Sequence, residues 1–275
     1  MTAIGQMFRE VYAFRELLVA LTYRDIRVKY KQAVMGMLWA FFMPVLAILS
    51  GIIFRMAMAF FSGKPLIVAD ITAVMVKSVP WLLFASIVGS SSTSLISNMA
   101  LITKIYFPRE VVPLSSLLSS LFDFSIAVTG LIVALVLITM FAGSDPPPLI
   151  VSVHLLWVPL LLMLLVLMAA GLGLILSCAN LFLRDVKYIV SVRLQSGVFF
   201  SLVYFTHEEL GRWGKLLLLN PVAPLLEGLR LAVVEGRMEP AMLGWIAYSA
   251  TVAIVVFAVS TVIFDRAEYL FAEYV

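Results

Sequence analysis

The sequence predicts an all-α integral membrane protein with six transmembrane helices. The 275 residues are 63% hydrophobic and 13% charged, with a mean hydropathy of +1.09. A soluble domain is only about 45–50% apolar and about 25% charged. Several runs without charged residues reach the ~20 apolar residues that a helix needs to cross a bilayer. We therefore expect short loops, an N-terminal amphipathic interface helix, a short cytoplasmic coupling helix and a re-entrant extracytoplasmic helix pair before the last span.

Residues 1–31 are predicted to form the amphipathic cytoplasmic interface helix, followed by a transmembrane domain over residues 32–275. Apolar residues recur at helical spacing from Ile4 to Leu21, with charged residues off that stripe. Such a helix either lies in the membrane interface or docks on a partner. The segment lacks the pattern of a secretory signal, so we expect it to be retained. Four basic residues lie just before the first apolar run and should anchor the topology or contact lipid head groups: Arg24, Arg27, Lys29 and Lys31.

The first two spans are predicted over residues 32–61 and 78–97. Pro44 should kink the first, and Arg55 should extend from it toward the far surface. The second span carries hydroxyl side chains at each position of 90–94. These hydroxyls either allow close helix packing or form the wall of a wet pathway, and packing is the preferred interpretation.

A short helix is predicted in residues 98–106, at the membrane surface between the second and third spans. Its apolar face would consist of Leu101, Ile102, Ile105 and Tyr106, and Pro108 would end it. Lys104 and Arg109 flank the apolar residues, as expected for a segment at the membrane surface.

The next three spans are predicted over residues 111–141, 155–178 and 189–206. Gly171 and Gly173 should allow close helix approach in the fourth span. Asp123 in the third span and Arg193 in the fifth lie at similar expected depths. The two charges are therefore predicted to pair, either as a structural clamp or with a role in function.

Residues 208–240 are predicted to form a re-entrant or interfacial helix pair on the outer side. This segment is rich in charge but contains an apolar run, residues 216–226, that is too short to span and is interrupted by Pro221 and Pro224. The sixth span is predicted over residues 241–264.

The distribution of Lys and Arg predicts that both termini are cytoplasmic. With the N-terminus inside, the inner side holds about twice as many basic residues as the outer side. The formal net charge of +3 is modest and in such a protein indicates contact with membrane lipids rather than nucleic acid.

Motifs for nucleotide, metal or acid–base chemistry are absent from the sequence. No GxxxxGK[ST] loop is present, so the chain should not hydrolyse ATP by itself. His154 and His207 have no ligand neighbours in sequence, and there is no HExxH or CxxC. We therefore expect no metal site and no catalytic residues. The single cysteine, Cys178, excludes an internal disulfide.

Three segments carry a resemblance to a known family: RDIRVKYKQAVMGMLWAFFMPVLA at 24–47, NMALITKIYFPREVVPLSSL at 98–117 and NPVAPLLEGLR at 220–230. They resemble the membrane subunit of bacterial ABC-2 type polysaccharide-export ABC transporters of the O-antigen, teichoic-acid and capsule type. The resemblance implies a homodimer in the bacterial inner membrane, paired with two ATP-binding cassette subunits. It also implies a polyprenyl-pyrophosphate-linked polysaccharide as substrate, with ATP and Mg bound only by the partner subunits.

The resemblance also implies roles for named residues. Leu101, Ile102, Lys104, Ile105 and Tyr106 would couple the chain to its ATPase. The four basic residues from Arg24 to Lys31 would meet the lipid head group, although plain topological anchoring explains them equally well. Aromatic faces stack on sugar rings, so seven aromatic residues are candidates for lining a channel: Trp39, Phe42, Trp81, Phe84, Phe199, Phe200 and Tyr204.

Two alternatives stay open at this point. One is an ABC-2 permease that exports a drug or small lipid, against which the FPRE stretch at 107–110 argues. The other is a membrane enzyme that acts on lipid-linked sugars.

Overall fold

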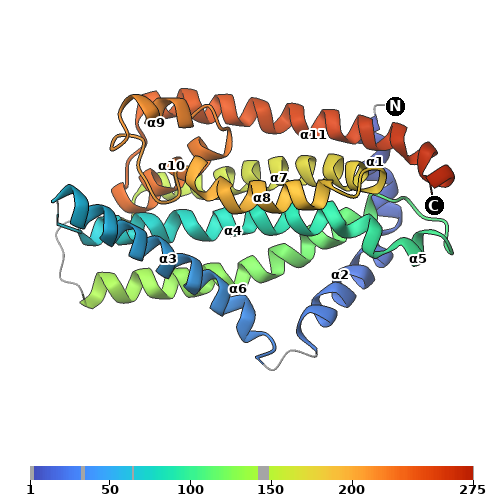
Figure 1. The fold of residues 1–275 in the computed structure, drawn as a ribbon, viewed down its shortest axis with the longest axis horizontal. Coiled ribbons are helices and arrows are strands. Elements are labelled where there is room, and N and C mark those ends of the chain that lie inside the picture. Colours follow the sequence, from blue (N-terminus) through green and yellow to red (C-terminus); the bar gives the residue numbers. More distant parts are fainter. Residues whose placement is uncertain (1–2, 32–34, 64, 142–148, 275) are drawn as a thin grey trace.

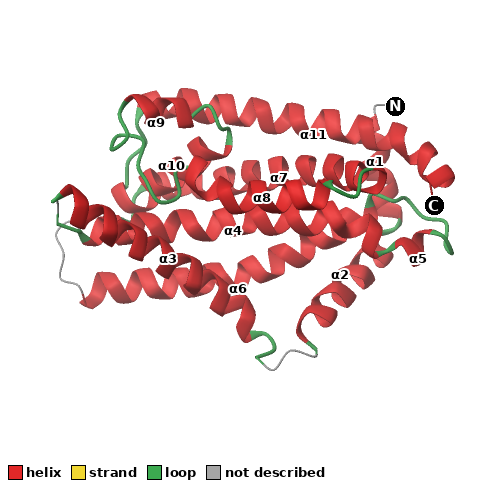
Figure 2. Cartoon of the chain, in the orientation of Figure 1, coloured by secondary structure: helices red, strands yellow, loops and turns green. Residues whose placement is uncertain are grey.

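The computed structural model of the chain describes residues 3–31, 35–63, 65–141 and 149–274, and every regular element in these ranges is a helix (Figures 1 and 2). Both termini and α5 lie at one end of the long axis, which we call the terminal end. We call the opposite end, where α9 and α10 lie, the capped end. The elements are α1 (Ala3–Ala13), α2 (Arg15–Tyr30), α3 (Leu38–Ser62), α4 (Val68–Ser97), α5 (Met99–Ile102), α6 (Val111–Phe141), η1 (Val153–Leu156), α7 (Trp157–Phe182), α8 (Val186–Phe200), α9 (Arg212–Leu217), α10 (Val222–Arg230), the π-helical turn η2 (Leu231–Glu235) and α11 (Pro240–Tyr274).

Five of the described helices are long and apolar enough to cross a membrane: α3, α4, α6, η1 with α7, and α11. The chain is therefore a multi-pass membrane protein, as the sequence predicts. The predicted fifth span, 189–206, is helical only to Phe200. The 15 residues of α8 cover about 22 Å at 1.5 Å per residue, short of the ~30 Å hydrocarbon core. A sixth crossing therefore stays a prediction.

The core of the bundle is built around α4. In its most apolar stretch 78% of residues are buried, against 11% in α3 and 17% in α6, which lie at the periphery. Close approach of α7 to its neighbours depends on the two predicted glycines. A Cβ on Gly173 would lie 2.7 Å from the Cβ of Ser91, and one on Gly171 would lie 2.9 Å from the Cα of Phe257. The prediction that these glycines allow close packing is confirmed.

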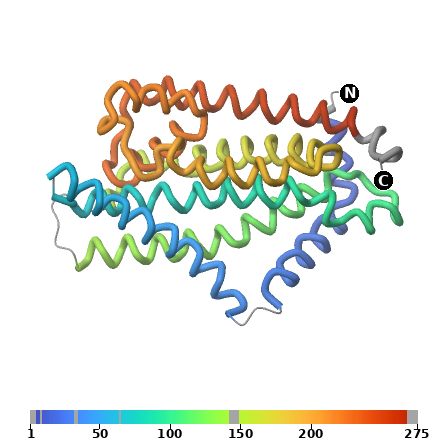
Figure 3. The backbone as a smooth tube through the Cα atoms, viewed as in Figure 1, coloured from blue at the N-terminus to red at the C-terminus, as the bar shows by residue number. Residues whose placement is uncertain are grey.

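The N-terminal segment forms two helices rather than the single predicted one. The backbone departs from helical geometry at Phe14, with φ −100° and ψ 24°, between α1 and α2. Met7 and Leu21 of the predicted apolar stripe are buried in a second core at the terminal end, together with Phe264 of α11. The helix α1 thus packs on α11, and α2 slants away from the terminal end along α6 (Figure 3).

Candidate functional site

The basic segment on α2 is fixed to the terminal end of the bundle by Arg24. Its guanidinium donates to Asp25 Oδ1 at 2.7 Å and to Asn98 Oδ1 at 2.5 Å. The other carboxylate oxygen of Asp25 accepts a hydrogen bond from Ser115 at 3.3 Å. Through these contacts α2 is held against the end of α4 and the start of α6.

Asp123 pairs with α2 and not, as predicted, with Arg193. Lys29 and Tyr30 both donate to its carboxylate, one to each oxygen. Burial, together with this hydrogen bond, raises the pKa of the Tyr30 phenol, so it stays protonated and donates. Arg193 is exposed on α8, where its guanidinium carbon lies 5.6 Å from the ring centre of Phe200. The predicted pair fails because α2 folds back along α6, which places Lys29 and Tyr30 instead of Arg193 beside Asp123.

The four predicted head-group residues divide into two sets. Arg24, Arg27 and Lys31 line a pocket of about 380 Å³ on α2, which we call the basic pocket. The other lining residues, Ala20, Tyr23 and Val28, carry no carboxylate. The guanidinium carbon of Arg27 lies 4.6 Å from the ring centre of Tyr23. Lys29 faces Asp123 instead, so only three of the four cations can meet one anionic group in this pocket.

A second cavity, of about 560 Å³, lies between α2, α4 and α6, and we call it the hydroxyl groove. Its polar lining consists of side chains that both donate and accept hydrogen bonds, plus two paired cations and a carboxylate. The lining residues are Arg24, Asp25, Val28, Lys29, Ser90, Thr93, Ser94, Ser97, Asn98, Ser116, Ser119 and Ser120.

The hydroxyl cluster at 90–94 packs helices together on one face and lines the groove on the other, and a wet pathway along it stays a prediction. Ser91 and Ser92 are buried. Ser91 donates to the carbonyl of Pro113 at 3.1 Å, and the carbonyl of Ser92 accepts from Asn180 at 2.9 Å, so this face packs helices together. Ser90 and Thr93 are only half-buried and line the groove. Helical periodicity separates the two faces.

The predicted coupling segment is only partly helical. Met99–Ile102 form α5, and after a short turn and bend at 103–105 the chain is irregular up to Pro108. Leu101 and Ile102 are half-buried against the core at the terminal end. Lys104 is exposed, as are Ile105 and Tyr106, with 55% and 98% of their surfaces accessible. The role of this segment in coupling stays a prediction.

The capped end holds a buried charge cluster around Glu227, whose side chain is fully buried. Its carboxylate contacts Lys77 at 3.3 Å, His207 at 3.1 Å and Arg230 at 2.8 Å. Burial by itself would raise the pKa of Glu227, but Lys77 and the other two cationic partners outweigh it and lower the pKa to about 2. The carboxylate is therefore charged and joins α4 to α10.

Lys77 lies inside a helix, although the predicted second span begins only at residue 78. The helix α4 begins at Val68, and Lys77 is 1% exposed. Its ammonium also donates to the carbonyl of Phe205. One signal in the sequence indicates a buried partner for Lys77. Glu227 and Arg230 form a charged pair at helical spacing within an apolar segment.

Arg55 is likewise buried instead of reaching the far surface. It donates to both oxygens of Glu209, at 2.7 and 2.8 Å, and forms an ion pair with Asp70. The contacts join α3 to the start of α4 and to the segment before α9. Both buried cations thus connect a long helix to the segments at the capped end.

His207 has acidic neighbours that the sequence did not suggest. One ligand-capable atom of each of His207, Glu208 and Glu239 lies within 4.8 Å of the others. Two of the three side chains also have other partners: His207 contacts Glu227, and Glu239 forms an ion pair with Arg237 at 3.3 Å.

The aromatic channel candidates fall into buried and accessible groups. Trp81 and Phe84 stack on each other with ring centres 5.6 Å apart, and both are buried in the core, so they are wrongly placed on a channel wall. Trp39 and Phe42 are 37% and 41% exposed. At the capped end, Phe199 and Tyr204 contact the ring of Phe54 at 5.8 and 5.6 Å.

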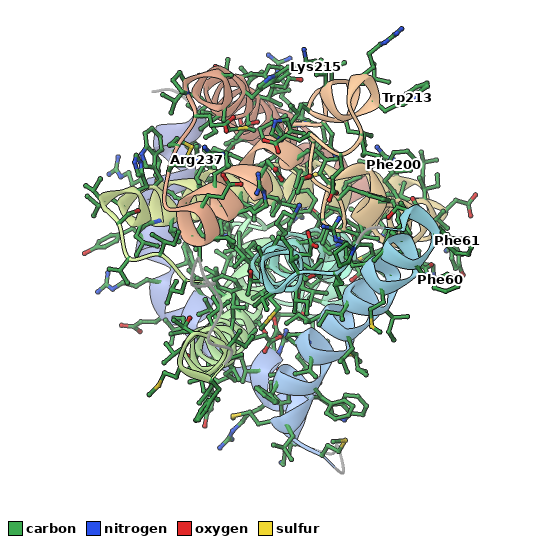
Figure 4. All side chains as sticks on the ribbon, turned by 90° about the vertical axis from the view of Figure 1, so that its left-hand side faces the viewer. Phe60, Phe61, Phe200, Trp213, Lys215 and Arg237 are labelled. Carbon is green, nitrogen blue, oxygen red and sulfur yellow. The ribbon has the colours of Figure 1, made fainter. Side chains whose placement is uncertain are left out.

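Figure 4 views the capped end and shows Phe200 on the same side as Phe60 and Phe61 of α3, with Arg237 on the other side. Phe199 and Phe200 are 44% and 49% exposed. Five of the seven aromatic candidates thus have accessible rings: Trp39, Phe42, Phe199, Phe200 and Tyr204. Their role in a channel wall stays a prediction.

Comparison with known proteins identifies related sequences over nearly the whole chain. Residues 16–234 match the ABC-2 type transporter family. An O-antigen export system permease protein RfbA of Klebsiella pneumoniae is 26% identical over 262 residues, which cover 94% of each chain. The RfbA permease of Myxococcus xanthus is 26% identical over 275 residues, covering 98% of each chain.

Proposed function

Because the chain belongs to the ABC-2 type transporter family, we propose that it is the channel-forming membrane subunit of an ATP-driven exporter of lipid-linked, O-antigen-like polysaccharide. The observation that carries the proposal is end-to-end similarity to permeases named for O-antigen export. Similarity over the whole length supports a shared transport task better than similarity confined to a few helices would. The chain transports and does not catalyse, in keeping with a sequence that lacks catalytic motifs.

ATP hydrolysis takes place on two separate nucleotide-binding subunits, which also hold the Mg. The terminal end offers them exposed side chains at Ile105 and Tyr106, on a segment connected to α4 and α6. In this arrangement the terminal end is cytoplasmic, the protein resides in the bacterial inner membrane, and both termini are inside.

The substrate approaches from the cytoplasmic leaflet. Arg24, Arg27 and Lys31 bind its pyrophosphate in the basic pocket, because guanidinium and ammonium groups form strong charge-assisted hydrogen bonds to phosphate oxygens. The polymer then passes between two copies of the chain, against accessible aromatic faces such as Phe199 and Phe200. The segment 208–240 is the re-entrant cap that gates the outer end.

Gene deletion with complementation tests the proposal. We expect loss of surface polysaccharide, with lipid-linked polymer accumulating inside the cell, and copurification of the tagged chain with an active ATPase. Unchanged surface polymer would favour a drug or small-lipid exporter. Loss of polymer synthesis itself would indicate a membrane enzyme acting on lipid-linked sugars.

A further inference from the structure

We propose that the hydroxyl groove is a sugar-binding subsite, which receives the sugar units next to the lipid pyrophosphate. The inference rests on the proposed function, which places the pyrophosphate in the adjacent basic pocket. It adds a second recognition element, so that the chain selects its substrate by its first sugars as well as by its phosphates.

The groove has the size and the hydrogen-bonding capacity that a short saccharide requires. Its volume of about 560 Å³ falls within the range of about 300–1,000 Å³ found for ligand pockets. Ser90, Thr93 and Ser97 are accessible along the α4 wall. A hydroxyl has one donor and two acceptor positions, so each of these side chains can accept a hydrogen bond from a sugar hydroxyl even when its own hydrogen is engaged.

The existing contacts leave acceptor capacity on these hydroxyls. Thr93 donates to the carbonyl of Ser90 at 3.2 Å, and Ser97 donates to the carbonyl of Thr93 at 3.0 Å. With their hydrogens directed to the helix backbone, the oxygen lone pairs stay available to the groove. The sugar hydroxyls would therefore act mainly as donors to α4.

The charge balance of the groove favours a neutral ligand over a second phosphate. Arg24 forms an ion pair with Asp25, and Lys29 forms one with Asp123. Each cation that lines the groove thus already has a carboxylate partner. Besides Arg24, which the two cavities share, Arg27 and Lys31 line the basic pocket and no carboxylate does, so an anionic group is favoured there and a polyhydroxyl group in the groove.

The two cavities are neighbours that share lining residues. Arg24 and Val28 line both of them. A ligand whose phosphate contacts Arg24 in the basic pocket can therefore extend its next covalently attached unit into the groove. In a polyprenyl-pyrophosphate-linked polymer that next unit is a sugar, which is why the order of the two cavities fits this class of molecule.

Binding measurements on filled-groove variants test the inference. The transporter complex in nanodiscs would be titrated with three probes: a polyprenyl-pyrophosphate disaccharide, polyprenyl pyrophosphate without sugar, and phosphatidylglycerol. For the wild type we expect the disaccharide probe to bind most tightly. The double variant Ser90→Leu with Thr93→Leu should weaken that probe about tenfold, since it removes two hydrogen-bonding groups, and leave the sugar-free pyrophosphate unchanged.

Two further variants serve as controls. Ser125→Leu introduces the same side chain at an exposed position of α6 that lies outside the groove, and it should bind all three probes as the wild type does. Ser90→Thr retains a hydroxyl and should keep the preference for the disaccharide. If the double variant fails to assemble, the single variant Thr93→Val, which has nearly the volume of threonine, replaces it.

The inference is overturned if the wild type binds the disaccharide and sugar-free probes equally, or if the filled-groove variant keeps the preference. Equal binding of phosphatidylglycerol and the disaccharide probe would assign the groove to bulk lipid. These outcomes are independent of gene deletion, because a chain required for polymer export could still lack a sugar subsite. Failure of the proposed function would instead appear as unchanged surface polymer in the deletion strain.

Discussion

At the scale of single residues, Glu227 determines the stability of the capped end. It is the common partner of Lys77, His207 and Arg230, and all four side chains are buried or half-buried. Removing one member of a buried ion pair is strongly destabilising because the remaining charge is left without a partner.

Substitution of Glu227 by Gln should therefore destabilise the purified chain by about 3–5 kcal/mol. The glutamine keeps the size of the side chain but leaves Lys77 without a carboxylate partner and Arg230 with Glu235 alone. Thermal unfolding in detergent, followed by tryptophan fluorescence, would measure the loss. Glu208→Gln removes an exposed carboxylate from the same region and should have little effect. Equal melting temperatures for the two variants would contradict the importance of the cluster.

His207 should make the stability of the capped end depend on pH. Its hydrogen bond to Glu227 raises the pKa of the imidazole above 6.5, and Glu208 adds to the effect while burial and Arg230 oppose it. A raised folded pKa stabilises the fold fully below the unfolded pKa of about 6.5, and this stabilisation is lost as pH rises through the folded value. We expect the melting temperature to fall as pH rises above about 6.5, and His207→Gln to flatten that profile. An identical slope in both proteins would contradict this assignment.

At the scale of helices, the sequence predicts best where apolar periodicity is uninterrupted. The predicted span 111–141 coincides with α6, and the predicted span 155–178 lies within η1 and α7. Prediction fails where a charge within a helix is compensated by a distant residue. Lys77 marked a false helix start because its partner, Glu227, lies in a segment that sequence alone cannot place beside it. The predicted partner of Asp123, Arg193, is wrong, because the actual partners depend on how α2 folds back.

The close contact between α7 and α11 requires that residue 171 be a glycine, which has no side chain. A Cβ there would lie 2.9 Å from the backbone of Phe257, which cannot move without shifting α11. Gly171→Ala should cost about 1–3 kcal/mol, the usual cost of overpacking. A Cβ on Gly244 of α11 would meet no atom within 4 Å, so Gly244→Ala should be neutral or slightly stabilising. Thermal melts of the two variants would measure this difference, and equal melting temperatures would contradict the role of Gly171.

The segment after α5 should be required for binding the ATPase subunit. Tyr106 is 98% exposed at the terminal end, and exposed aromatic side chains are frequent anchors of protein interfaces. Tyr106→Asp should weaken copurification of the ATPase about tenfold or more. Trp213, 71% exposed at the capped end, provides the matched control, and Trp213→Asp should leave assembly unchanged. Loss of assembly in both variants would indicate general misfolding.

At the scale of the whole molecule, the two ends differ in chemistry. The half of the molecule next to the terminal end holds the basic pocket, the hydroxyl groove and exposed side chains at Ile105 and Tyr106, whereas the capped end holds the buried charge cluster around Glu227. The distribution of Lys and Arg predicts the terminal end to be cytoplasmic, although Lys77 and Arg55 do not contribute as surface charges.

Cysteine labelling of intact cells would measure this orientation. The only cysteine, Cys178, is buried, so the wild type should not react with a membrane-impermeant maleimide. Trp213→Cys should be labelled from outside, whereas Tyr106→Cys should react only after the inner membrane is permeabilised. The reverse pattern would mean that both termini are outside and would contradict the proposed direction of transport.

The ion pair between Lys77 and Glu227 also has a consequence for biosynthesis. The two residues are 150 positions apart in the chain, which corresponds to roughly 8–30 s of translation at about 5–20 residues per second. During that interval α4 carries an ammonium group whose counter-charge has not yet been made. Lys77 must therefore stay hydrated at the membrane boundary until α10 emerges, so closure of the capped end is a late step in the assembly of each newly made chain.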